Sequence, residues 1–152
     1  MALLPHNLEG NLRYATVDWS FPRRLELNWY NENLREKGLY YISRKFGGKE
    51  TLLYIGKTSD KFYNRFCAHY WSWMPWYRGE KYFRLGIITY PERPSDMGQL
   101  IIDVESALIY TMQPKVNWMS KKNIAPRHEY IITNTGYRGE LHPEISMRDF
   151  RR

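Results

Sequence analysis

Residues 38–56 read GLYYISRKFGGKETLLYIG, and this stretch decides which fold the sequence predicts. Two runs within it, 39–44 and 51–56, are rich in Tyr, Ile and Leu and have the composition of short strands. The polar residues between the runs include Gly47 and Gly48, which suit a tight turn. The stretch therefore predicts an antiparallel hairpin.

The predicted elements around the hairpin are, in chain order, a helix over 22–36, a helix over 61–73, a strand over 82–90 and a helix over 96–113. Ser95 or Asp96 caps the last of these helices, and a proline follows it. Residues 118–152 are basic and turn-rich, with one strand-like piece at 130–133. A mixed order with an early hairpin predicts an α+β fold in which helices cover a short sheet.

The composition of the chain favours a polyanionic partner and limits the class of protein. Lys and Arg total 23 against 16 Asp and Glu, a net charge of +7, and the 6 Trp, 13 Tyr and 6 Phe supply rings that stack on bases. Hydrophobic residues at 43% exclude wholesale disorder, and no uninterrupted apolar run approaches the length of a membrane span. Cys67 is the only cysteine, which excludes an internal disulfide and a Cys-based zinc site. With a start that lacks a signal-peptide pattern, these features favour a reducing, cytoplasmic compartment.

Glu105 falls on the predicted apolar face of the 96–113 helix. At about 100° per residue it lies between Ile101 and Ile109, whereas Asp103 falls on the opposite, solvent-facing side. An ionised carboxylate that is removed from water needs a cation or hydrogen-bond donors to stabilise it. Glu105 is therefore interpreted as a metal ligand or catalytic acid in a cleft, or as one member of a structural ion pair.

Arg65 and His69 lie one turn apart on the predicted 61–73 helix, at one edge of its apolar stripe. A guanidinium beside a group that exchanges protons near neutrality suits the binding and processing of a phosphate. The alternative is an arginine whose stem covers apolar surface next to a half-buried histidine.

Together these residues resemble the motifs of the GIY-YIG nuclease family. The first tripeptide of the family is present as Gly-Leu-Tyr and the second is intact, and a longer stretch separates them than is usual, its extra residues lying at the hairpin tip. The resemblance covers 38–117, and it depends on Gly38-Leu39-Tyr40, Tyr54-Ile55-Gly56, Arg65, His69, Glu105 and Asn117. The last of these, Asn117, would brace the site or hydrogen-bond within it.

The resemblance implies a small three-stranded antiparallel sheet flanked by helices, and hydrolysis of phosphodiester bonds in DNA. The length of the chain predicts a single domain over 1–152. Within it the resemblance implies a nuclease core over 38–117, with extensions at 1–37 and 118–152. The extensions would recognise a target in a site-specific, restriction-type endonuclease, or branched or single-stranded DNA in a repair or mobile-element nuclease. A nucleic-acid-binding module without turnover is the third alternative.

The resemblance also implies catalytic roles. Tyr40 would act beside the attacking water as general base or its relay, and Tyr54 would support it from the paired strand. Arg65 would hold the scissile phosphate, and His69 would assist proton transfer or bind phosphate. Glu105 would ligate one divalent cation, Mg²⁺ with Mn²⁺ as a substitute, since Mg²⁺ keeps several waters and takes few carboxylates from protein.

Basic and aromatic residues outside the motif extend the expected DNA surface. The side chains expected to contact nucleic acid are Lys57, Arg78, Lys81, Lys121 and Lys122. The aromatic run 70–77 has two interpretations, stacking on bases or covering a core or homodimer interface. We expect DNA as partner and no membrane association, and a homodimer stays open.

Overall fold

The hairpin predicted from 38–56 is present, and both of its strands are longer than the predicted runs 39–44 and 51–56. In the computed structural model, which describes residues 12–25, 38–58, 62–122, 124 and 126–150, β3 (Gly38–Phe46) pairs antiparallel with β4 (Lys49–Thr58). Gly47 and Gly48 form the turn with φ of 62° and 77°, a left-handed conformation that favours glycine. The hairpin prediction is confirmed.

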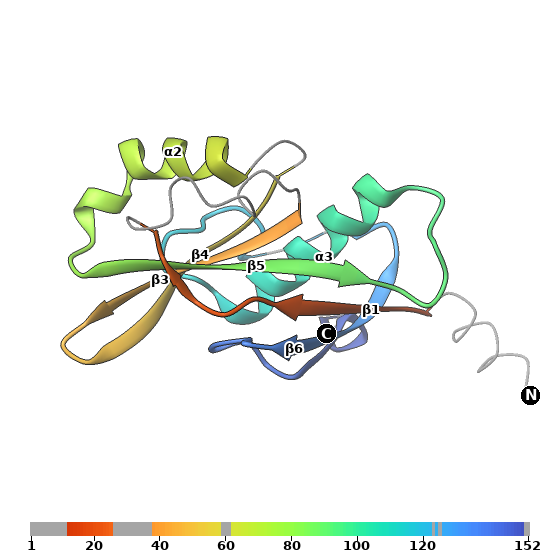
Figure 1. Cartoon of the computed structure of the whole chain (residues 1–152). Helices are drawn as coiled ribbons and strands as arrows, with labels where there is room; N and C mark the ends of the chain where they lie inside the picture. Colours follow the sequence, from red (N-terminus) through yellow and green to blue (C-terminus); the bar gives the residue numbers. More distant parts are fainter. Residues whose placement is uncertain (1–11, 26–37, 59–61, 123, 125, 151–152) are drawn as a thin grey trace, which may run out of the picture.

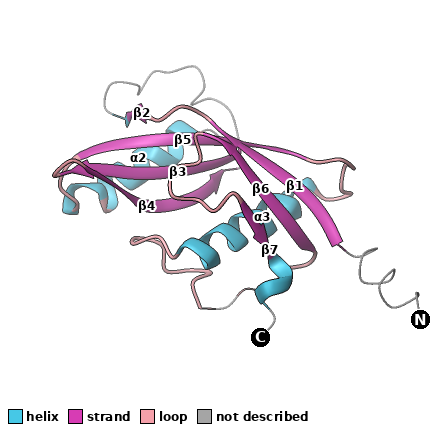
Figure 2. Cartoon of the chain, turned by 90° about the horizontal axis from the view of Figure 1, so that it is seen from below, coloured by secondary structure: helices cyan, strands magenta, loops and turns pink. Residues whose placement is uncertain are grey.

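The hairpin forms one end of a seven-stranded sheet in the described part of the chain. The strand order is β4-β3-β5-β1-β6-β7, and β2 pairs with β5 beside this path. The remaining strands are β1 (Leu12–Trp19), β2 (Arg23–Arg24), β5 (Glu80–Thr89), β6 (Glu129–Gly136) and β7 (Glu144–Ser146). All neighbours are antiparallel except β1 and β6, which run parallel, so the sheet is mixed. Figures 1 and 2 show that it curls along its length.

The predicted fold class, α+β with a small three-stranded antiparallel sheet flanked by helices, is wrong. The structure is mostly β, because segments on both sides of 38–117 add strands to the sheet. In β1 every second residue, Ala15, Val17 and Trp19, is buried. The residues that alternate with them, Tyr14, Thr16 and Asp18, are exposed or partly exposed, as is typical of a strand. The basic tail was expected to carry a single strand-like piece, and instead it supplies both β6 and β7.

Two α-helices are present among the described residues, α2 (Phe62–Ser72) and α3 (Met97–Met112), close to the predicted bounds. Asp96 caps α3 by accepting a hydrogen bond from the Gln99 backbone N–H, and Pro114 follows its last turn. Two short 3₁₀ turns are η3 (Met74–Trp76) and η4 (Met147–Phe150). The helix predicted over 22–36 is wrong at its start, which includes β2, and its later residues lie outside the described ones. No described helix has the length and apolarity to cross a membrane.

Side-chain alternation along β3 divides the interior into two cores. Tyr40 and Ile42 join a cluster that includes Phe62 and Phe66 of α2. Leu39 and Tyr41 point the other way, into a larger cluster that includes α3, β1 and β6. Figure 1 shows α2 lying along one side of β3 and β5.

Asp103 corrects the helical-wheel prediction for α3. It was placed on the solvent-facing side, yet only 1% of its surface is exposed. Its carboxylate accepts hydrogen bonds from the backbone N–H groups of Arg127 and His128 at 3.2 Å and from Gln99 Nε2 at 2.8 Å. Residues 127 and 128 of the C-terminal segment therefore cover the face of α3 that carries Asp103. A helical wheel describes one helix and cannot predict which other segment packs on it.

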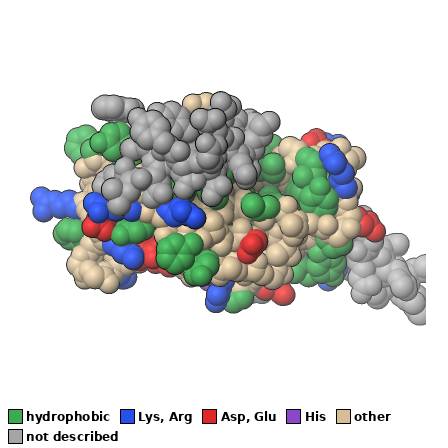
Figure 3. Space-filling view, viewed as in Figure 1, with side chains coloured by type: hydrophobic (Ala, Val, Ile, Leu, Met, Phe, Trp, Pro, Cys, Tyr) green, Lys and Arg blue, Asp and Glu red, His purple; other side chains and the backbone are tan. Residues whose placement is uncertain are grey.

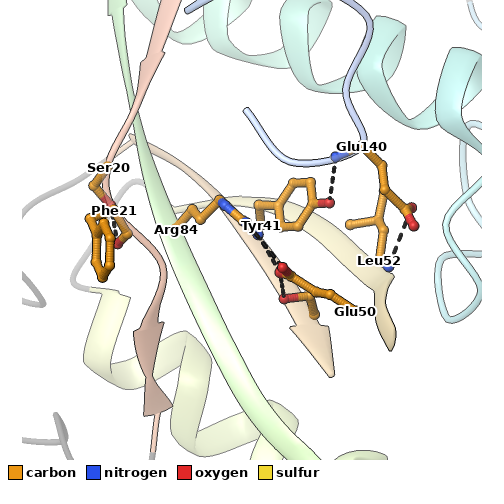
Figure 4. Close-up of polar contacts among 8 residues, drawn as sticks. Ser20, Phe21, Tyr41, Glu50, Leu52, Arg84 and Glu140 are labelled. Atoms are coloured by element: carbon orange, nitrogen blue, oxygen red, sulfur yellow. Dashed lines mark hydrogen bonds and ion pairs between the residues drawn. The ribbon is translucent and has the colours of Figure 1, made fainter. Parts of the chain in front are cut away.

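A polar cluster ties the C-terminal segment to the larger core (Figure 4). The Glu140 backbone N–H donates to Tyr41 Oη at 3.0 Å, and the Leu52 N–H donates to the Glu140 carboxylate at 3.4 Å. The Arg84 guanidinium lies over the Tyr41 ring at 4.8 Å and donates to Glu50 at 2.6 Å. Since 5% of Arg84 is exposed, this ion pair is largely removed from solvent.

Replacing Glu50 with Gln is expected to destabilise the protein at neutral pH by about 1–3 kcal/mol, because it leaves the Arg84 charge facing a neutral amide. Burial raises the pKa of Glu50, but hydrogen bonds from Arg84 and Ser43 outweigh it and lower the net value below 4.5. The stabilisation is therefore present above about pH 4.5 and lost as pH falls through the folded-state pKa. Urea unfolding of the wild type and of Glu50→Gln, at neutral pH and at about pH 3.5, measures the difference in their free energies of unfolding. An equal difference at the two pH values would contradict the assigned role of the Glu50 charge.

Candidate active site

Two tyrosines from neighbouring strands face each other on the α2 side of the sheet. Tyr40 lies opposite Gly56 in the β3–β4 register, and Tyr54 lies opposite Ile42. The two phenol rings stack with centroids 6.0 Å apart and planes 18° apart. Tyr40 is fully buried and Tyr54 is partly exposed, so the pair connects the smaller core to the surface.

The glycines of the two tripeptides are required by this packing. A Cβ at Gly56 would overlap the ring and hydroxyl of Tyr40, so only glycine lets the ring lie across β4 here. Gly38 has a φ of 146°, and a Cβ there would lie 2.9 Å from the Gly86 carbonyl oxygen. Both glycines are explained by the placement of Tyr40 and its strand.

Three side chains four residues apart approach the tyrosines, two from helix α2 and one from Trp73, the residue directly after it. His69 Nε2 lies 2.7 Å from Tyr40 Oη, and the Trp73 indole N–H donates to His69 Nδ1 at 2.7 Å. The Arg65 guanidinium reaches the hydroxyls of both Tyr40 and Tyr54. Arg65 itself is exposed, so a solvent-accessible cation lies beside a buried hydrogen-bond network.

The ionisation states in the network follow from burial and from Arg65. Burial raises the pKa of Tyr40 and Tyr54 above 10, against the opposing effect of Arg65. Burial and the positive charge of Arg65 lower the pKa of His69 to about 4. At neutral pH both tyrosines carry their protons and His69 is uncharged.

Glu105 lies on α3 within electrostatic range of the tyrosines. Burial raises its pKa to about 7, although Lys57 and Arg65 act in the opposite direction and the Lys57 backbone N–H donates to the carboxylate. The side chain is partly exposed. A carboxylate that is costly to ionise and open to water on one side has the chemistry of a ligand for a hydrated hard cation.

Glu105 is the carboxylate that the site offers to a metal ion. The described residues contain no group of three or more His, Cys, Asp or Glu side chains placed to share an ion. A closed cage of protein ligands is therefore not built by this part of the chain. Mg²⁺ does not need one, since it is bound in many phosphoryl-transfer sites by one or two carboxylates, waters and phosphate oxygens.

Asn117 supports the exposed edge of β4. Its side-chain amide accepts from the Ile55 backbone N–H at 2.9 Å and donates to the Ile55 carbonyl at 2.8 Å, while the Val116 N–H donates to the Leu53 carbonyl at 2.8 Å. These bonds satisfy backbone groups that an edge strand leaves unpaired. Asn117 thus fixes the strand segment that carries Tyr54.

The predicted nucleic-acid contacts differ in accessibility. Arg78 and Lys122 are exposed, and Lys57 and Lys121 are partly exposed. Lys81 is buried with Nζ donating to the Gly79 carbonyl at 2.8 Å, and we leave it out of the proposed surface. Figure 3 shows Lys and Arg side chains gathering with some Asp and Glu at the hairpin end of one face, so this face presents mixed charge.

Two tryptophans that were not among the predicted site residues lie beside residues that were. Trp73 belongs to the aromatic run 70–77. Its position four residues after His69 is the sequence signal for a contact between the two side chains. Trp118, directly after Asn117, is 85% exposed. Two cavities of about 590 and 280 Å³ lie elsewhere, and neither is lined by a residue of the two tripeptides or by Arg65, His69, Glu105 or Asn117.

Comparison of the chain with protein-family models, with curated proteins and with solved structures gave no match. The interpretation of the site therefore depends on residue types and geometry. The fold brings Tyr40, Tyr54, Arg65 and His69 into one network. Glu105 lies near this network, and Asn117 is hydrogen-bonded to β4.

Proposed function

We propose that the chain is a divalent-metal-dependent nuclease of the GIY-YIG type, which hydrolyses phosphodiester bonds in DNA. The observation that carries this proposal is the convergence of Arg65, His69 and Glu105 on a stacked tyrosine pair. A cation that touches two phenol hydroxyls, next to a water-accessible carboxylate, supplies the parts that phosphodiester hydrolysis needs.

Arg65 positions the scissile phosphate and adds positive charge where the transition state gains negative charge. Because its guanidinium is exposed and already contacts both tyrosines, a phosphate bound there lies beside the tyrosine pair. Tyr40 first loses its phenol proton to solvent, and the resulting phenolate then takes a proton from the attacking water. The water oxygen bonds to phosphorus as the bond from phosphorus to the leaving alkoxide breaks. Tyr54 orders the water from the partly exposed side.

Glu105 would hold Mg²⁺, for which Mn²⁺ can substitute. When bound, this ion supplies polarisation of a phosphoryl oxygen and stabilisation of the leaving alkoxide. The chain contributes one hard anionic ligand, held by the Lys57 backbone N–H, and the positive charges of Lys57 and Arg65 favour its ionised form. Asn117 holds β4 through its two hydrogen bonds to the Ile55 backbone.

A cleavage panel tests the proposal and separates its alternatives. Purified protein is incubated with plasmid, single-stranded oligonucleotides and branched junctions, with Mg²⁺, with Mn²⁺ and with chelator. Discrete plasmid fragments indicate a restriction-type enzyme, whereas cutting of branched or single-stranded DNA alone indicates a structure-selective nuclease. Binding without cleavage of any substrate would overturn the enzyme proposal in favour of a silent nucleic-acid-binding module.

Trp118, which is 85% exposed, is a candidate for stacking on bases near the site. Trp118 follows Asn117, which is hydrogen-bonded to the strand that carries Tyr54. Trp118→Ala is expected to weaken DNA binding by about 10-fold, since stacking of a base on an aromatic ring contributes about 1–3 kcal/mol. Trp76→Ala is the matched control, because Trp76 is equally exposed, at 83%, and lies on η3. Fluorescence anisotropy with labelled oligonucleotides measures both; equal losses would contradict a specific role for Trp118.

A further inference from the structure

His69 sits between two hydrogen-bonding groups whose chemistry differs. On one side, Trp73 Nε1 lies 2.7 Å from His69 Nδ1, and on the other, Tyr40 Oη lies 2.7 Å from His69 Nε2. An indole N–H is a donor and has no acceptor capacity, whereas a phenol hydroxyl donates or accepts. The Trp73 contact therefore has one direction only.

This direction fixes the tautomer of His69. Because Nδ1 accepts from Trp73, it carries no proton, and the single proton of the neutral ring must be on Nε2. Nε2–H then donates to Tyr40 Oη, which places the proton of Tyr40 itself away from the histidine. The doubly protonated ring is excluded by the same contact, since it would set the Nδ1–H against the indole N–H.

The surroundings hold the ring in this orientation. The His69 ring lies 4.4 Å from the Tyr54 ring and 5.5 Å from the Trp73 indole, measured between centroids, and 6% of the residue is exposed. Among the residues that the structure describes, the charged and titratable groups that face it are Arg65 from its own helix and Tyr40 and Tyr54 from the sheet.

We propose that Trp73 is a positioning residue that locks His69 as the Nε2–H tautomer, so that His69 donates to Tyr40 and cannot accept its proton. The tautomer of His69 follows from these contacts alone, whereas its role in catalysis rests on the proposed nuclease function. It assigns the general base to the tyrosine, since a phenolate at Tyr40 accepts a hydrogen bond of fixed direction from His69 Nε2–H and is stabilised further by the nearby Arg65 cation. A relay in which Tyr40 passes its proton to His69 is closed by the Trp73 N–H.

The decisive measurement is the ¹⁵N spectrum of the His69 imidazole in the full chain, which needs no substrate. In the wild type at neutral pH we expect a pyrrole-like Nε2 and a pyridine-like Nδ1 without exchange between tautomers. Trp73→Phe keeps an aromatic ring and removes the N–H, so we expect tautomer averaging and an upward shift of the His69 pKa, because Nδ1 becomes free to bind a proton. Trp76→Phe, on the exposed Trp76, is expected to leave the His69 signals unchanged. A protonated Nδ1 in the wild type overturns the proposal, as does an unchanged spectrum in Trp73→Phe.

Cleavage assays on the same two variants test the catalytic consequence separately. Trp73→Phe is expected to lower kcat by roughly 10-fold with little change in KM, as is typical when a partner that orients an active-site group is lost. Absence of cleavage by the wild type overturns the proposed function and leaves the tautomer assignment standing. A locked tautomer combined with full activity of Trp73→Phe overturns the positioning role alone.

Discussion

Glu105→Gln is expected to lower the rate of DNA cleavage by about 10²- to 10³-fold or more, because the amide cannot replace an anionic ligand to a divalent cation. The substitution preserves the size of the side chain and an acceptor for the Lys57 backbone N–H. Plasmid cleavage over a range of Mg²⁺ concentrations measures the effect, and higher Mg²⁺ should not restore it. Glu92→Gln is the matched control, since Glu92 is exposed in the loop after β5 and is expected to retain full activity.

The same substitution has a stability signature that does not depend on substrate. Burial raises the pKa of Glu105 from 4.5 to about 7, so the folded protein binds a proton more tightly than the unfolded chain. The contribution of this group to stability is fully present below about pH 4.5 and is lost as pH rises to about 7, a difference of up to roughly 3 kcal/mol. Glu105→Gln is expected to be the more stable protein above pH 7 when metal is absent.

Thermal unfolding of the wild type and of Glu105→Gln, with and without Mg²⁺, tests whether the ion binds at Glu105. At about pH 8, Mg²⁺ is expected to raise the Tm of the wild type, because the ion binds the ionised carboxylate of the folded state, and to leave Glu105→Gln unchanged. An equal rise of Tm in both proteins would show that Mg²⁺ binds elsewhere, even if the variant were inactive.

The parts of the fold that could be predicted are those determined by local sequence. The β3–β4 hairpin follows from two apolar runs and Gly47-Gly48, and α3 from its cap at Asp96 and the proline after it. The larger sheet depends on pairing between distant segments, such as β1 with β6, which no local pattern specifies. Local patterns predict the elements, whereas the register between remote strands is set by burial of both faces at once.

The candidate site also has some features that local sequence predicts and others that depend on contacts in the folded chain. The spacing of Arg65 and His69 on one helix follows from helical periodicity. The pairing of the strands that carry Tyr40 and Tyr54 follows from the predicted hairpin, and the resemblance to the nuclease family implies their shared role. The donor to His69 could not, since it depends on the rotamer of Trp73. Nor could the need for glycine at Gly56, which arises from the Tyr40 ring lying across it.

Tyr40→Phe is expected to lower kcat by about 10²- to 10⁴-fold, the range typical for loss of a general base. The variant keeps the ring that packs on Phe62 and Phe66 and removes only the oxygen that His69 and Arg65 contact. The His69 Nε2–H then has no phenol acceptor, so a stability loss of about 1–3 kcal/mol accompanies the rate effect. Single-turnover cleavage with saturating DNA separates the chemical step from binding.

Tyr41→Phe is the matched control from the next position on the same strand. Its hydroxyl accepts from the Glu140 backbone N–H in the opposite core, so its loss costs about 1 kcal/mol of stability and leaves cleavage unchanged. Burial raises the pKa of Tyr40 above 10, so the phenolate fraction, and with it the wild-type rate, is expected to rise about tenfold per pH unit between about pH 8 and 10. Residual cleavage by Tyr40→Phe should lack this slope, because the group that titrates is gone; the same slope in the variant would assign the base to another residue.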